Sequence, residues 1–99
     1  MPITDIDDWD QIENVSGDYT FSGSEEGVRW SDSSGPGSVS LVDIGTHEKE
    51  QILISNTSSR VLRIIAFTNQ PIEGYDEVRM RRGTLQLYKL PDNSGWGLK

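Results

Sequence analysis

The sequence has 99 residues, with 16 acidic and nine basic side chains and a formal charge of -7. A chain of this length forms one small domain, and we expect little room for a substrate cleft. Because the chain contains no Cys and a single His, it lacks the residues for a disulfide framework and for a thiolate or multi-His zinc site.

The first sixteen residues differ from the rest, and we treat them as an N-terminal acidic arm (1–16) that precedes a single β domain (17–99). An α-helix would spread their apolar residues, which recur at every third position, around its girth, whereas an extended polyproline-type segment would align them. Thr4 and Asp7 form a possible capping box, so one or two helical turns are the alternative. The apolar residues are Ile3, Ile6, Trp9, Ile12 and Val15.

The remaining chain is poor in Ala and rich in Ser, Thr, Gly, Val and Ile, which favours strands joined by turns. We expect an all-β fold, a small antiparallel β-sandwich or barrel of six to seven short strands with an extended N-terminal arm. The candidate strands are residues 18–22, 28–30, 39–44, 51–55, 60–67, 77–81 and 84–90.

The clearest pattern lies at residues 51–67, where two apolar runs flank the polar residues 56–59. This pattern predicts a β-hairpin with a four-residue loop. The second run, at 60–67, is apolar at both alternate sets of positions, so we expect it to be a central strand that is covered on both faces.

The two halves of the chain carry opposite charge. Residues 1–50 contain twelve acids and two bases, whereas residues 51–99 contain four acids and seven bases. An acidic arm and an arginine cluster would form a natural docking pair, within one chain or between two, because guanidinium groups match carboxylates in geometry and charge. The cluster is Arg79, Arg81 and Arg82, joined by Arg60 and Arg63 if their strands are neighbours.

Several chemistries lack their residue patterns. His47 lies in a charged, turn-like stretch with no Gly-x-Ser-x-Gly motif in the chain, so we expect it to face solvent. The acids lie mostly in the arm and loops, where burial would not separate the pKa values of a catalytic pair. The aspartates of the arm fail the calcium-loop pattern, because Asp10 stands where Gly is required. We therefore expect no enzyme, no cofactor and no metal site.

The partners are expected to be proteins. A sequence pI near 4.5 disfavours both nucleic acid and anionic membranes. No apolar run reaches the roughly 20 residues of a membrane-spanning helix, and no secretory signal is visible, so we expect a soluble protein made in the cytosol. Carbohydrate binding is the alternative, with Tyr75 and Trp96 as stacking rings, although Trp96 is better suited to pin the C-terminus.

Together these features predict a non-catalytic structural module that binds neighbouring protein subunits through its arm and an arginine-bearing face. A compact β body with an acidic arm resembles, in type only, the small decoration and tail accessory proteins of tailed phages. That resemblance implies a homo-oligomer or binding on a larger lattice such as a virion.

Overall fold

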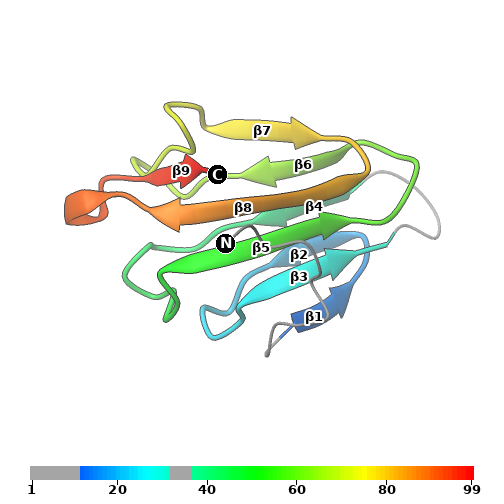
Figure 1. The fold of residues 1–99 in the computed structure, drawn as a ribbon, viewed down its shortest axis with the longest axis horizontal. Coiled ribbons are helices and arrows are strands. Elements are labelled where there is room, and N and C mark those ends of the chain that lie inside the picture. Colours follow the sequence, from blue (N-terminus) through cyan, green and yellow to red (C-terminus); the bar gives the residue numbers. More distant parts are fainter. Residues whose placement is uncertain (1–11, 32–36) are drawn as a thin grey trace.

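The computed structural model describes residues 12–31 and 37–99. In these residues nine strands form two sheets that pack as a β-sandwich and do not close into a barrel (Figure 1). Sheet A has the order β1-β3-β5-β8-β9, and sheet B has the order β2-β4-β6-β7. The strands are β1 (Ile12–Val15), β2 (Asp18–Thr20), β3 (Gly27–Trp30), β4 (Gly37–Ser40), β5 (Gln51–Asn56), β6 (Leu62–Ile65), β7 (Glu77–Met80), β8 (Gly83–Lys89) and β9 (Trp96–Leu98).

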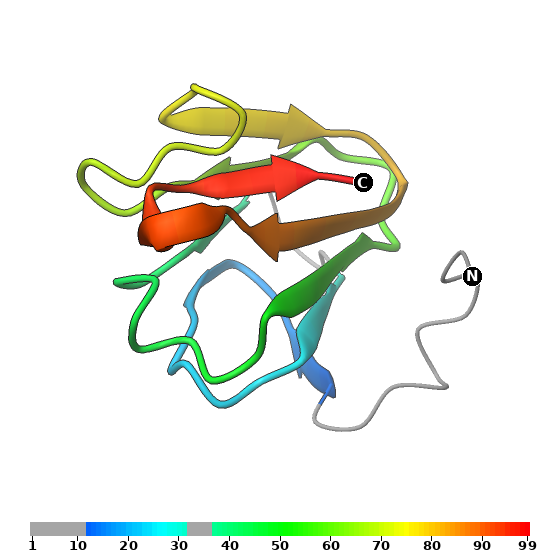
Figure 2. The ribbon, with the colours of Figure 1, turned by 60° about the vertical axis from the view of Figure 1, so that its left-hand side comes forward.

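The first six strands alternate between the two sheets. β1, β3 and β5 pair in parallel in sheet A, and β2, β4 and β6 pair in parallel in sheet B. Each pair of successive strands therefore makes one turn of a flattened β-helix, visible in Figure 2. β7, β8 and β9 then add antiparallel strands. The all-β prediction is confirmed, but an antiparallel sandwich is wrong for β1 to β6, because each crossover runs through a strand of the opposite sheet.

The predicted hairpin at 51–67 is also wrong. β5 pairs with β3 and β8 in sheet A, whereas β6 pairs with β4 and β7 in sheet B. The chain changes sheet at Asn56, which is 1% exposed and donates from Nδ2 to the carbonyl oxygens of Arg60 (2.7 Å) and Met80 (3.3 Å). The buried amide thus supplies a hydrogen-bond donor to two backbone carbonyl groups where the chain leaves sheet A.

Only part of the expectation for the central strand holds. β6 is an interior strand of sheet B, but Arg63 on its outer face is exposed. The strand with side chains buried on both faces is β5, in the middle of sheet A, where Ile52 and Ile54 face the core and Leu53 is also buried.

The core lies between the sheets and contains residues from both. Trp30 and Trp96 are its largest members, and the indole N–H of Trp30 donates to the carbonyl oxygen of Gly17 at 2.8 Å. β3 and β5 come close at Gly27, where an added Cβ would lie 2.4 Å from the carbonyl oxygen of Leu53, so no larger residue fits there without moving the backbone.

Candidate interaction surface

Because the strands alternate in direction between the sheets, the connections collect at the two ends of the sandwich. Residues 16–17, 57–61 and 81–82 connect strands at one end, on the right in Figure 1. Residues 21–26, 41–50, 66–76 and 90–95 connect strands at the opposite end. Chain segments that are distant in sequence are therefore brought together at each end.

The first end gathers arginines. Its described connections carry Arg60, Arg81 and Arg82, all exposed, and within the described residues they carry no acid. The contacts of Asn56 with the carbonyl oxygens of Arg60 and Met80 tie the two connections together. We call this surface the arginine end. β6 and β7 are neighbours in sheet B, so the condition under which Arg60 and Arg63 join the arginine cluster is met.

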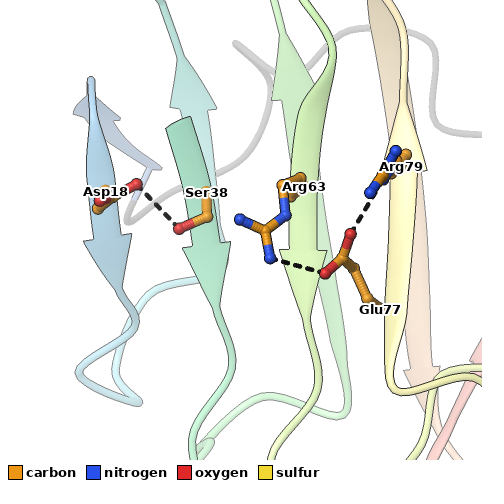
Figure 3. A network of polar contacts seen from close by, with 5 residues as sticks. All are labelled: Asp18, Ser38, Arg63, Glu77 and Arg79. Carbon is orange, nitrogen blue, oxygen red and sulfur yellow. Dashed lines mark hydrogen bonds and ion pairs between the residues drawn. The ribbon is translucent and has the colours of Figure 1, made fainter. Parts of the chain in front are cut away.

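Two further arginines lie on the outer face of sheet B, one residue pair in from the end of the β6–β7 ladder. Arg63 on β6 is directly opposite Arg79 on β7. Glu77 bridges them, with Oε1 2.8 Å from Arg63 Nη2 and Oε2 3.0 Å from Arg79 Nε (Figure 3). These two hydrogen bonds lower the pKa of Glu77 to about 2. On the same face Ser38 donates to Asp18 at 3.0 Å.

The opposite end is acidic. Its connections carry eight carboxylates and one lysine. We call this surface the acidic end. All but two of these acids are exposed; Glu25 is buried and Glu26 is half-buried. The acids are Glu25, Glu26, Asp43, Glu48, Glu50, Glu73, Asp76 and Asp92.

Beneath this surface lies a buried polar cluster centred on Glu25, which is 3% exposed. Its Oε2 accepts hydrogen bonds from the Tyr19 hydroxyl and the Ser22 N–H, and its Oε1 accepts from the Ser22 hydroxyl and the Gly23 N–H, each of the latter at 2.9 Å. Burial raises the pKa of Glu25, but these hydrogen bonds outweigh it and lower the pKa to about 2. The carboxylate therefore acts as a fixed acceptor for the 21–26 loop.

The prediction that His47 faces solvent is wrong, because His47 is 1% exposed. Its ring packs on Phe21 and Trp96, with centroids 5.3 and 5.1 Å away. Nε2 accepts the N–H of Val42 at 3.2 Å, and the Nζ of Lys89 donates to the carbonyl oxygen of His47 at 2.6 Å. The sequence analysis did not predict this burial, because the residues next to His47 in the chain are polar or charged.

The burial of His47 also affects its charge and its hydrogen bonds. Burial lowers its pKa, so the imidazole is neutral at pH 7. Among the described residues Nδ1 has no hydrogen-bond partner, and no hydrogen bond joins His47 to Ser22 or Glu25. The ring therefore fills the interior beneath the acidic end.

The arm residues have separate outcomes. Ile12 and Val15 lie in β1, the edge strand of sheet A, and Val15 accepts the N–H of Ser31 at 2.9 Å. Ile3, Ile6 and Trp9 lie outside the described residues. The sequence analysis did not predict β1, because the apolar residues at every third position do not show the alternation of a strand. It also did not predict β9.

The two rings of the carbohydrate alternative also differ. Tyr75 is 66% exposed and presents its ring to solvent, whereas Trp96 is fully buried among the core residues and offers no face to a ligand. Phe67, at 41% exposed, is the other large hydrophobic residue that is exposed in the described chain.

No group of three or more His, Asp or Glu side chains in residues 12–31 and 37–99 is arranged to hold a metal ion. The same residues include no helix with the length and apolar character needed to cross a membrane. Comparisons with protein-family models, with curated proteins and with solved structures find no match to this chain.

Proposed function

We propose that this chain is a non-catalytic assembly module that binds an acidic surface of a neighbouring protein subunit through its arginine end. The observation that carries the proposal is the gathering of Arg60, Arg81 and Arg82 by two connections at one end of the sandwich. Capsid decoration and tail accessory proteins of phages are settings in which such a module would serve.

The side-chain chemistry supports a protein partner. Arginine is enriched at protein interfaces because its planar group forms bidentate contacts with carboxylates and packs on aromatic rings. Arg81 and Arg82 occupy a two-residue connection between β7 and β8, so little chain order has to be gained on binding. Single-stranded nucleic acid would favour aromatic rings beside the cations, but the exposed rings of Phe67 and Tyr75 are on the 66–76 connection at the other end.

The proposal also assigns the N-terminal arm a contact with neighbouring subunits, through Ile3, Ile6, Trp9, Ile12 and Val15. β1 supports part of it, because β1 is an edge strand and edge strands offer backbone groups to another chain. β1 is also paired with β3, so a test of the arm removes residues 1–11 and keeps residues 12–15.

Photo-crosslinking tests the arginine end. In the native host, Thr84 is replaced by a photoreactive residue, because Thr84 is exposed beside the Arg81–Arg82 connection. A second variant carries the same photoreactive residue in place of Asp92 and is the control for the opposite end. We expect adducts from position 84 to map to an acidic segment of one protein and to disappear in Arg81→Ala/Arg82→Ala. They should persist in Lys49→Ala/Lys99→Ala, which changes the net charge equally. Adducts with nucleic acid alone, or protein adducts unaffected by the arginine substitutions, would contradict the proposal.

The carbohydrate-binding alternative has the support of one exposed ring, Tyr75. It predicts that an oligosaccharide from a glycan array binds the wild-type chain and that Tyr75→Ala loses this binding. An array without signal removes the alternative.

A further inference from the structure

The 66–76 connection at the acidic end, which we call the aromatic loop, carries the two large hydrophobic residues that are exposed in the described chain, Phe67 and Tyr75. The N–H of Ala66 donates to the carbonyl oxygen of Asp76 at 2.9 Å. Phe67 follows Ala66 in the chain and Tyr75 precedes Asp76, so both lie one residue further into the loop than this hydrogen bond. Two aromatic residues are thus exposed on one loop, and the exposed Asp76 follows Tyr75 in the chain.

The tip of the aromatic loop is held in place. Ile72 and Tyr75 exchange two backbone hydrogen bonds of 2.8 Å, and Ile72 is fully buried. The N–H of Glu73 donates to the carbonyl oxygen of Trp96 at 2.8 Å, and a Glu73 carboxylate oxygen accepts the N–H of Leu98 at 3.1 Å. Because its backbone is already ordered, the loop can present the Tyr75 ring to a partner at a small cost in conformational entropy.

We propose that the aromatic loop of one copy binds the arginine end of a second copy, so that the chain associates head to tail along its strand direction. This inference rests on the proposed function of the arginine end and identifies its partner. Arg81 and Arg82 of one copy would stack on Tyr75 and pair with the carboxylate of Asp76 of the next. Guanidinium groups are attracted both to the faces of aromatic rings and to carboxylates, and the aromatic loop offers both.

The arginine end and the aromatic loop lie at opposite ends of the sandwich, which favours a contact between two copies over a contact between the two surfaces of one copy. β5 has six residues and extends about 20 Å from one end to the other. That separation exceeds the Debye length of about 8 Å at physiological salt, so the two ends act as independent surfaces. Each copy carries one surface of each kind at opposite ends, which makes the contact heterologous and permits rings or filaments.

Molar mass measured by light scattering over a range of protein concentrations tests this contact. We expect the wild-type mass to rise beyond that of two chains at low salt and to fall at high salt. Arg81→Ala/Arg82→Ala and, separately, Tyr75→Ala/Asp76→Asn should each lower the association constant at least about tenfold. Lys49→Ala/Lys99→Ala should associate at least as strongly as wild type, because it removes no side chain of the proposed contact and lowers no acidic charge.

Mixing the two defective variants gives the sharpest result. Each retains the surface that the other has lost, so an equal mixture should form dimers and nothing larger. The substituted residues, Ala and Asn, are uncharged, so they do not create a new attractive contact between the ends of two copies. A mixture that stays monomeric, or a wild-type mass that never exceeds two chains, would overturn the head-to-tail contact.

The two proposals fail separately. If the wild-type chain is monomeric at every concentration but arginine-dependent adducts form with a different protein, the second copy is the wrong partner and the assembly function is supported. If neither association nor adducts occur, both proposals are overturned.

Discussion

The two ends of the sandwich differ in the length and role of their connections. The acidic end has connections of six, ten, eleven and six residues, whereas the fully described connections of the arginine end have two, five and two residues. The long connections send Phe21, Ile44, His47 and Ile72 into the core. These shorter connections bury no side chain, and 57–61 and 81–82 present arginines to solvent.

This difference separates stability from binding. Substitutions beneath the acidic end remove hydrogen bonds or packing from the interior, where the cost is large. Substitutions at the arginine end change exposed side chains, which contribute little to folding but a great deal to attraction between surfaces. The two kinds of substitution should therefore differ in their effect on the free energy of unfolding.

Glu25→Ala is expected to be the most destabilising of these changes. It leaves the Tyr19 hydroxyl and the N–H groups of Ser22 and Gly23 without their acceptor. The free energy of unfolding, measured in urea, should fall by about 3 kcal/mol. Glu26→Ala, at the half-buried neighbouring position, should change it by less than about 0.5 kcal/mol. Equal effects of the two substitutions would show that the buried cluster does not hold the 21–26 loop.

The same carboxylate makes stability depend on acid. The pKa of Glu25 is about 2 in the folded protein, against an ordinary value of 4.5. Its contribution is fully present above about pH 4.5 and is lost as the pH falls towards 2, since the unfolded chain binds the proton first. In Glu25→Gln the loss of stability between pH 4.5 and 2 should therefore be shallower than in wild type. A parallel decline would contradict the lowered pKa.

His47 is expected to have an intermediate effect, visible at higher pH. Its pKa lies below the ordinary value of 6.5, so below that pH the unfolded chain takes up a proton that the folded chain does not. Wild-type stability should fall as the pH is lowered from 6.5 to 5. Because the chain has one His, His47→Leu should remove this slope. A slope that persists would assign it to carboxylates.

Glu77→Gln should have a smaller effect on stability than Glu25→Ala. Glu77 bridges Arg63 and Arg79 on an exposed face, where solvent screens the attraction. The urea midpoint should decrease slightly, and the decrease should become smaller at high salt. A shift as large as that of Glu25→Ala would show that the outer face of sheet B contributes to folding as strongly as the buried cluster.

Arg81→Ala/Arg82→Ala should leave the unfolding free energy within about 0.5 kcal/mol of wild type, because both side chains are exposed in a short connection. Association measured on the same samples should nevertheless weaken. If stability falls by several kilocalories per mole, the arginine end belongs to the folding core and the division between the two ends is wrong.

Several local features were predictable from residue patterns alone. The β-branched and apolar residues at 28–30, 51–55 and 84–90 identified β3, β5 and β8, because such residues favour an extended backbone wherever the strand is placed. The exposure of Tyr75 was also expected. The pattern failed at 41–44, where apolar residues belong to a connection that folds over the core, and at His47, whose neighbours are all polar or charged.

By itself the sequence determined that the chain is all-β, where most strands lie and that the arginines occur late in the chain. Only the tertiary structure decided that β5 and β6 enter different sheets and that the acids and arginines separate to opposite ends. The physical reason is that alternation specifies which face of a strand is buried, but a two-sheet sandwich offers the same burial in either sheet. Backbone pairing and the buried amide of Asn56 make that choice.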